Sequence, residues 1–220
     1  MSNGISFPSM AAAISLLVLA PMAAQAGNAD AGLYAAAPPP NSAFVRVLSA
    51  ASDGHAVQAV IGKAKYSASA GSASTYKVVP AGKAVVQIGA ATQGATFVDG
   101  RYYTLVVSGP AAKPAVAIIE DPKLDSKVKG LITFYNLTHR PSLTLKTADG
   151  KAAVVAGVAS GKVAGRSVNS ATTGFVVVDG NAVIGQIPAQ TVERGNAYSS
   201  IATEIGGKTK VVWVRSEAGR

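Results

Sequence analysis

The sequence contains no cysteine, so it has no disulfide framework, no thiolate metal site and no cysteine nucleophile. Charged residues are only 14% of its 220 residues and apolar residues are 49%, a balance that excludes a disordered polyelectrolyte. Aromatic residues are also few, at 6%, whereas alanine, valine, glycine and serine are abundant. Small and β-branched side chains of this kind favour the core of a β-sandwich.

The N-terminus has the features of an export signal. Residues 11–20 form an apolar run, and Ala24-Gln25-Ala26 then matches the small-x-small pattern of a cleavage site. This predicts a secretory signal peptide, residues 1–26, that is cleaved after Ala26. The alternative is a retained anchor, but a helix needs about 20 apolar residues to span a bilayer. We therefore expect an exported chain that does not span the membrane once processed.

The remainder of the chain has no helical periodicity. Short runs of Val, Ile, Tyr and Thr alternate with Gly, Pro, Asn and Asp, which is typical of an all-β protein. The first half predicts strands at residues 43–48, 57–63, 74–79, 84–88, 95–98, 102–107 and 116–120. The second half predicts strands at residues 131–137, 143–147, 152–158, 165–168, 174–178, 190–192, 198–203 and 210–215. Each half has about the size of one immunoglobulin-like sandwich.

The two halves also resemble each other. A G-x-x-Y motif occurs at residues 100–103 and again at 195–198, an offset of 95 residues. At the same offset, the strand at residues 115–119 corresponds to residues 210–214. The late strands of the two halves are therefore expected to be equivalent, and Tyr103 and Tyr198 are expected to form a tyrosine corner in each copy.

The offset is smaller at the front of each copy. Residues 44–47 correspond to residues 132–135 at an offset of 88, so the second copy carries about seven extra residues, expected around residues 159–165 or 179–189. The duplication predicts two tandem antiparallel β-sandwich domains. They comprise residues 27–122 and 130–220, joined by a charged linker at residues 123–129. A linker this short allows hinge motion but keeps the domains in contact.

Few residues could carry chemistry. A Ser-His-Asp site needs a histidine, and only His55 and His139 exist, both in expected turns. The sequence has no G-x-S-x-G elbow, no His-Glu-x-x-His pattern and no phosphate-binding glycine loop. Asp99, Asp149 and Asp179 each precede glycine, the signature of a hairpin turn. We assign no catalytic, cofactor-binding or metal-binding residue, and we expect no cofactor.

The formal net charge of +9 predicts attraction to polyanions or to acidic protein surfaces. Export and the lack of an arginine-aromatic repeat argue against nucleic acid. The basic residues are scattered, which usually indicates solvated faces. Arg46 interrupts the apolar run at residues 44–48, and we expect it to point outward from an alternating strand. Trp213, the sole tryptophan, is expected to be a core residue rather than part of a sugar-stacking platform.

Several segments resemble the AlgF family, an exported alginate O-acetylation protein of pseudomonad-type bacteria. They are residues 30–34, 42–47, 131–138, 142–151, 165–169 and 193–199. Residues 35–41 depart from it, being rich in Ala and Pro where a more polar segment is expected. The resemblance implies a periplasmic, non-catalytic component that is peripheral to an inner-membrane complex and bridges the acetyl-transfer proteins AlgJ and AlgX.

Three hypotheses for function remain open. The first is an adaptor that binds the acetyl-transfer proteins, the second is a module that binds alginate itself, and the third is an acetyl-carrying enzyme that uses a serine with His55 or His139. For the first two hypotheses, the candidate partner-binding residues come from the matched segments and exposed turns: Arg46, Arg101, Arg140, Lys146, Lys151, Arg166 and Arg194.

Overall fold

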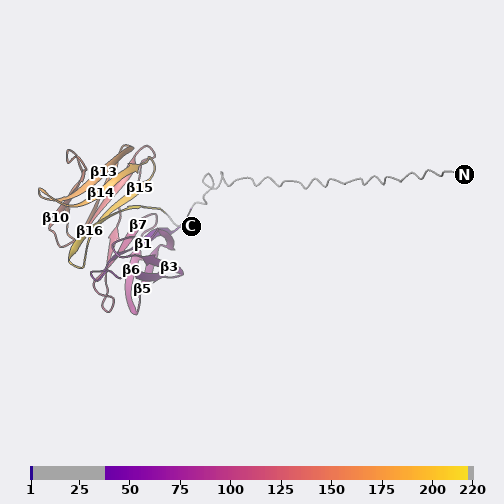
Figure 1. Cartoon of the computed structure of the whole chain (residues 1–220). Helices are drawn as coiled ribbons and strands as arrows, with labels where there is room; N and C mark the ends of the chain where they lie inside the picture. Colours follow the sequence, from indigo (N-terminus) through magenta and orange to yellow (C-terminus); the bar gives the residue numbers. More distant parts are fainter. Residues whose placement is uncertain (2–37, 218–220) are drawn as a thin grey trace. The chain divides into compact units, whose positions relative to one another are not determined.

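The computed structural model describes Met1 and residues 38–217, so the expected signal peptide at residues 1–26 lies, apart from Met1, outside the described residues. Figure 1 shows the chain. The sixteen strands all lie in the compact unit that begins at Pro38. The described part is all-β, as expected, and it forms four four-stranded sheets that pair into two sandwiches. No helix in this part is long and apolar enough to cross a membrane.

The first sandwich is built from eight strands. One sheet has the order β4-β1-β7-β8 and the other has the order β3-β2-β5-β6. The strand bounds are β1 Ser42–Ala50, β2 Val57–Ile61, β3 Ala64–Ala68, β4 Lys77–Pro80, β5 Gly82–Ile88, β6 Ala91–Phe97, β7 Tyr102–Ser108 and β8 Ala115–Glu120. Their inward side chains, which include Val45, Ile61, Phe97 and Leu105, form one buried core. All pairs are antiparallel except β1 with β7.

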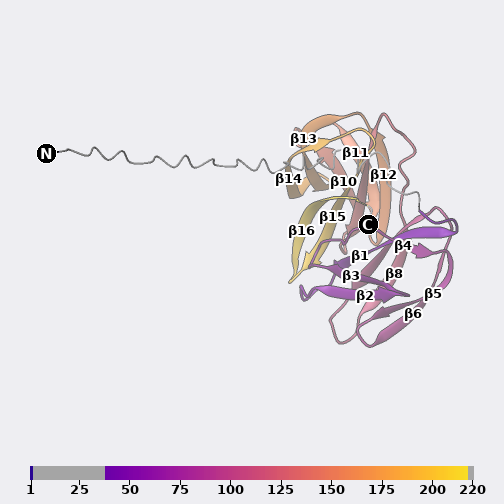
Figure 2. The same ribbon diagram turned by 90° about the vertical axis from the view of Figure 1, so that its right-hand side faces the viewer.

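The second sandwich repeats this topology eight strands later. Figure 2 shows strands of both sandwiches. Its sheets have the orders β12-β9-β15-β16 and β11-β10-β13-β14. The strand bounds are β9 Gly130–Leu137, β10 Ser142–Thr147, β11 Ala153–Ala159, β12 Lys162–Val168, β13 Ala171–Asp179, β14 Ala182–Val192, β15 Ala197–Ile205 and β16 Lys208–Arg215. The parallel pair recurs as β9 with β15. The two copies therefore share one connectivity, and residues 121–129 between β8 and β9 form no strand.

The strand predictions were confirmed except at two places. β3 was missed, because its sequence Ala-Lys-Tyr-Ser-Ala contains a single strong strand former. β14 was predicted only at residues 190–192, although it extends over eleven residues. Gly185 and Pro188 interrupt its apolar pattern, and both residues usually argue against a strand interior. β14 is one of the two end strands of its sheet, where proline is tolerated.

The predicted front offset of 88 residues is wrong by one. Tyr103 pairs with Val45, and Tyr198 pairs with Ile132, so Val45 and Ile132 are equivalent at an offset of 87. Both side chains belong to the buried cores, as equivalence requires. A shift of one residue would instead turn every side chain of the strand to the opposite face. At this offset Arg46 corresponds to Thr133.

The extra residues of the second copy lie partly in β14. The β5–β6 turn pairs Ile88 with Ala91, and the β13–β14 turn pairs Asp179 with Ala182, an offset of 91. Because the offset then rises to 95 at the tyrosines, four of the extra residues fall in β14. The pairing of β13 with β14 is irregular at two points, which accommodates added residues within the ladder.

A third apolar cluster joins the two sandwiches. Leu48 and Val106, from β1 and β7, pack with Tyr135 and Ile201, from β9 and β15, and all four are at most 5% exposed. Leu48 is equivalent to Tyr135 at the offset of 87, and Val106 is equivalent to Ile201 at the offset of 95. The same faces of the two related sheets therefore meet, and the central strands are buried on both sides.

Candidate functional site

Arg46 lies at the centre of a buried polar network between the sandwiches. Arg46 points outward from the core of its own sandwich, as expected, but it does not reach solvent, because only 1% of it is exposed. Its side chain does leave the first core, but the second sandwich covers that face of β1. Within the first sandwich its Nε donates to Thr104 Oγ1 at 2.9 Å. Arg46 is thus committed to an internal contact and is not a surface cation.

The guanidinium also reaches the second sandwich at three points. Nη2 donates to the hydroxyl of Tyr135 at 2.7 Å and to that of Ser199 at 2.8 Å. Nη1 donates to Ser216 Oγ at 3.2 Å, and the hydroxyls of Ser199 and Ser216 are themselves 2.9 Å apart. One side chain of the first copy therefore satisfies three hydroxyls of the second.

Asp121 supplies the negative charge of this network. It follows β8 directly and is 7% exposed. Its Oδ2 accepts hydrogen bonds from Tyr76 at 2.7 Å and Thr104 at 2.6 Å, and its Oδ1 accepts one from Tyr135. Tyr135 therefore links the guanidinium of Arg46 to the carboxylate. A buried pair of charges is tolerated only when the charges are coupled and hydrogen-bonded, which offsets the cost of removing them from water.

The environment fixes the protonation of these groups. Burial alone would lower the pKa of Arg46, but Tyr135, Tyr76 and Asp121 together raise it above its ordinary value. Burial raises the pKa of Tyr76 and of Tyr135 well above the usual tyrosine value. The guanidinium also lies 4.5 Å from the centre of the Tyr76 ring. Arg46 is therefore charged and both phenols are neutral donors at any physiological pH.

A groove of about 630 Å³ borders this network. Its lining comes from the first sandwich, from the segment between β8 and β9, and from the second sandwich. The lining residues are Tyr76, Tyr102, Pro122, Lys123, Leu124, Leu131, Thr133, Gly195, Asn196, Ala197, Arg215, Ser216 and Glu217. Ser216 belongs both to the groove and to the network, so the groove leads to the buried arginine.

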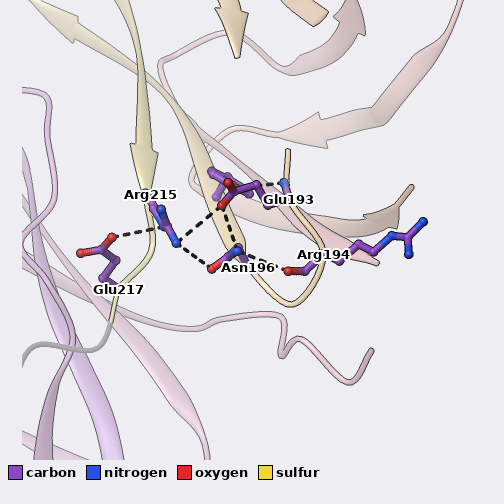
Figure 3. Close-up of polar contacts among 6 residues, drawn as sticks. Glu193, Arg194, Asn196, Arg215 and Glu217 are labelled. Carbon is purple, nitrogen blue, oxygen red and sulfur yellow. Dashed lines mark hydrogen bonds and ion pairs between the residues drawn. The ribbon is translucent and has the colours of Figure 1, made fainter. Parts of the chain in front are cut away.

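One wall of the groove carries a compensated charge cluster, drawn in Figure 3. Arg215 lies 3.7 Å from Glu193 and 3.2 Å from Glu217, and it donates to Asn196 at 3.0 Å. Asn196 in turn donates to Glu193 at 3.1 Å. The side chain of Arg194 extends away from the others in Figure 3. Arg215 is therefore already bound within the cluster, whereas Arg194 faces outward.

The other predicted partner-binding residues lie on several different strands and loops. Arg101 pairs with Glu120 at 3.1 Å, and Arg140 pairs with Asp179 at 2.6 Å. Lys151 lies in the turn after β10, is exposed, and its backbone N–H donates to Asp149. Lys146 on β10 is half-buried and Arg166 on β12 is exposed. Carboxylates thus already compensate Arg101 and Arg140.

The histidines lie in turns, as expected. His55 Nδ1 contacts Asp53, while Ser49 Oγ donates to the backbone carbonyl of His55 and not to its ring. His139 is 97% exposed at its side chain and lies 3.6 Å from Glu204. Neither ring is hydrogen-bonded to a serine hydroxyl within residues 38–217. In the same range, no three His, Asp or Glu side chains come together in a way that could hold a metal ion.

Trp213, which was predicted to be a core residue, is only partly buried. Its ring stacks on Phe175 at 4.9 Å and on Tyr198 at 5.5 Å between centroids, and it packs against the second core. The tyrosine corners are confirmed. The hydroxyl of Tyr103 accepts from the N–H of Val98 at 3.2 Å, and that of Tyr198 accepts from Glu193 at 3.1 Å.

The residues that sequence reasoning missed are those around Arg46. No role was predicted for Tyr76, Thr104, Asp121 or Tyr135, because each is an ordinary strand or boundary residue in its own segment. The one available signal was Arg46 itself. A charged residue inside an apolar run can be buried only when another element of the structure supplies hydrogen bonds to it.

Comparisons with known proteins agree on one family. The family model "Alginate O-acetyl transferase AlgF" matches residues 13–199. The chain is 34% identical to the alginate biosynthesis protein AlgF of Pseudomonas putida, over 94% of both chains. It is also 34% identical to AlgF of Pseudomonas fluorescens, over 84% of this chain and 83% of that one.

Among solved structures, the C-terminal domain of AlgF from P. aeruginosa matches with 35% identity and a TM-score of 0.38, over 40% of this chain and 99% of that one. The family match spans both sandwiches and reaches into β15. On the strength of the family model and of these two full-length relatives, the chain belongs to the AlgF family of alginate biosynthesis proteins.

Proposed function

We propose that this chain is a non-catalytic periplasmic adaptor for the O-acetylation of alginate, and that it bridges the acetyl-transfer proteins AlgJ and AlgX. The names of the relatives support the pathway, since they are alginate biosynthesis proteins and their family model carries an O-acetyl transferase name. The bridging role and the periplasmic site are the further steps of this proposal.

The observation that carries the proposal is the buried junction between the sandwiches. Arg46 and Asp121 are satisfied only when both sandwiches are in place, and Leu48 and Ile201 share a core across them. Such a junction holds two domains in one orientation. A rigid body with a separate surface on each domain can hold two partners together without ordering a hinge on binding. This raises the effective concentration of one partner near the other.

The adaptor is tested by reconstitution. The processed chain, residues 27–220, is mixed with purified AlgJ and AlgX separately and together, and complexes are resolved by size-exclusion chromatography with light scattering. We expect two binary complexes and one ternary complex that forms only when this chain is present. A ternary complex that forms equally well without it, or the lack of any complex at tens of micromolar protein, would contradict the proposal.

The enzyme hypothesis requires a separate test. A variant with both His55→Ala and His139→Ala is expected to support polymer acetylation in cells at the wild-type level, because neither ring contacts a serine hydroxyl. Loss of acetylation with normal protein levels would favour catalysis by this chain.

A second candidate function is direct binding of the polyuronate, which the net charge of +9 favours. Titration with mannuronate oligomers at low and moderate salt distinguishes the two roles. Diffuse spectral changes that vanish with salt indicate charge attraction alone. Localised, saturable changes that persist indicate a sugar site and would favour this second role.

A further inference from the structure

A second cavity, of about 380 Å³, opens at one end of the second sandwich. It lies between the two sheets, where β10, β12 and β14 end and β9, β11 and β13 begin. Its lining residues are Lys129, Ile132, Thr147, Ala152, Ala153, Val154, Arg166, Ser167, Val168, Asn169, Ala171, Thr173, Phe175 and Val192. A volume of this size accommodates a small ligand or a large side chain with its neighbours.

The cavity has an apolar floor and a cationic rim. Ile132, Phe175 and Val192 are at most 2% exposed and belong to the core of the sandwich. Lys129 and Arg166 are exposed at the rim, and none of the lining residues is acidic. Arg166 Nη1 donates to the carbonyl of Ala153 at 2.9 Å, so the guanidinium is held across the mouth from β12 to β11.

The first sandwich has a larger side chain at one position of this lining. In each copy, the hydroxyl of the corner tyrosine accepts a hydrogen bond from the backbone N–H five positions earlier. This N–H belongs to Val98 in the first copy and to Glu193 in the second. The preceding residues, Phe97 and Val192, are therefore equivalent. Phe97 is 1% exposed and its ring lies 5.3 Å from that of Tyr103. The second copy has the smaller valine at this position, and Val192 lines the cavity.

We infer that this cavity receives an apolar side chain from a segment of a partner protein, and that Lys129 and Arg166 bind an acidic side chain next to it. This inference rests on the proposed adaptor function and names one of its contact sites. The charge of the rim selects for an acidic neighbour. The accessible apolar lining, from Ala152, Ala153, Val168 and Ala171, selects for the apolar group, since this area becomes covered only on binding.

The same features argue against a uronate sugar. Phe175 is the only aromatic residue that lines the cavity, so a sugar ring would depend on it for stacking. Phe175 is 2% exposed and already stacks on Trp213, so it does not present a free aromatic face. The cavity therefore fits a peptide segment better than a polyuronate.

The test fills the cavity as the first copy does. Val192→Phe should occupy the space, and Arg166→Glu should reverse the charge at its mouth. We measure the affinity of the processed chain for AlgJ and for AlgX and expect each variant to weaken binding of one of them by about tenfold or more. Lys162→Glu is the matched control, because Lys162 is an exposed cation on the same strand that does not line the cavity. It should change affinity by less than about twofold.

The outcomes separate the two proposals. If the wild-type chain binds neither protein, the adaptor function fails and the cavity inference fails with it. If it binds but both cavity variants bind equally well, only the cavity inference is overturned. Thermal unfolding and the methyl spectra of Ile132 and Val154 establish that Val192→Phe is folded. If it is not, Arg166→Glu with its Lys162 control decides the matter.

Two other occupants would also overturn the inference. Mannuronate oligomers that shift the methyl signals of Ile132 and Val192 saturably would make the cavity a sugar site. A chain lacking residues 27–37 that binds a partner about tenfold more tightly would show that its own N-terminal arm fills the cavity. We expect neither effect.

Discussion

The hydroxyl of Tyr135, in the second sandwich, accepts a hydrogen bond from Arg46, in the first, and passes one on to Asp121. A guanidinium and a carboxylate are thus joined through one phenol at a surface from which water is excluded. Removing either charge leaves the other buried without compensation, a situation that costs about 3–5 kcal/mol. This relationship leads to the first two predictions.

The first prediction is a double-mutant cycle at the junction. Arg46→Met and Asp121→Asn are each expected to lower the free energy of unfolding by about 3 kcal/mol, because each strands the opposite charge. The double variant should lose less than the sum, with a coupling of about 1–3 kcal/mol. Urea unfolding followed by the fluorescence of Trp213 measures all four corners. Strict additivity would mean that the two charges do not depend on each other.

The second prediction concerns alkaline pH. Burial raises the pKa of Tyr76 and Tyr135 above the ordinary value of about 10, so the folded chain keeps protons that the unfolded chain loses. The stability from these phenols is complete below about pH 10 and falls as pH rises further. The free energy of unfolding should therefore decrease progressively as pH rises above about 10.

Tyr135→Phe provides the control for this pH dependence. The variant has one fewer phenol to titrate, so its stability should fall less steeply with pH than that of the wild type, although it starts from a lower value. Equal slopes for the two proteins would contradict the assignment of this pH dependence to Tyr135.

The third prediction concerns the close contact between β14 and β16. A Cβ at Gly185 would overlap Cγ2 of Val211, on the facing sheet. Gly185→Ala is therefore expected to destabilise the chain by about 1–3 kcal/mol through overpacking. Adding Val211→Ala should return part of this loss. Gly94→Ala on β6, where an added Cβ has nothing within 4 Å, is the control and should not destabilise.

The fourth prediction uses the duplication directly. Tyr103→Phe and Tyr198→Phe each remove one hydrogen bond to a backbone N–H at the same place in the two copies. Each should lower the free energy of unfolding by about 1 kcal/mol. Thermal or urea unfolding of both variants gives the comparison. A large loss for one tyrosine and none for the other would show that the two corners are not equivalent.

The sequence predicted the architecture well because both copies repeat the same spacing of strand and turn residues. It failed at β3 and β14, where residues such as Gly185 and Pro188 obscure the pattern and only the neighbouring strands decide the conformation. The predicted offset of 88 residues between the first strands of the two copies was wrong by one, because offsets of 87 and 88 both align similar residues. Only the pairing of Val45 with Tyr103 resolves which face each residue takes.

The polar network between the sandwiches could not be predicted from the sequence for a different reason. The prediction that Arg46 turns away from its own core was sound, but the sequence does not say what lies beyond that face. Residues such as Asp121 and Ser216, 75 and 170 positions away from Arg46, meet at the network only once both sandwiches have folded and packed. Local pattern therefore predicts each sandwich, and long-range packing decides the site.

The equivalence of Arg46 with Thr133 has a consequence for how such a junction can arise. Two identical subunits meeting through these same faces would each bring an arginine, and two buried like charges would repel each other. A fused duplicate escapes that symmetry, since one half can keep the cation while the other changes to hydroxyls that receive it. Because the two copies are covalently linked and differ in sequence, only one of them contributes a buried cation to their shared surface, and like-charge repulsion is avoided.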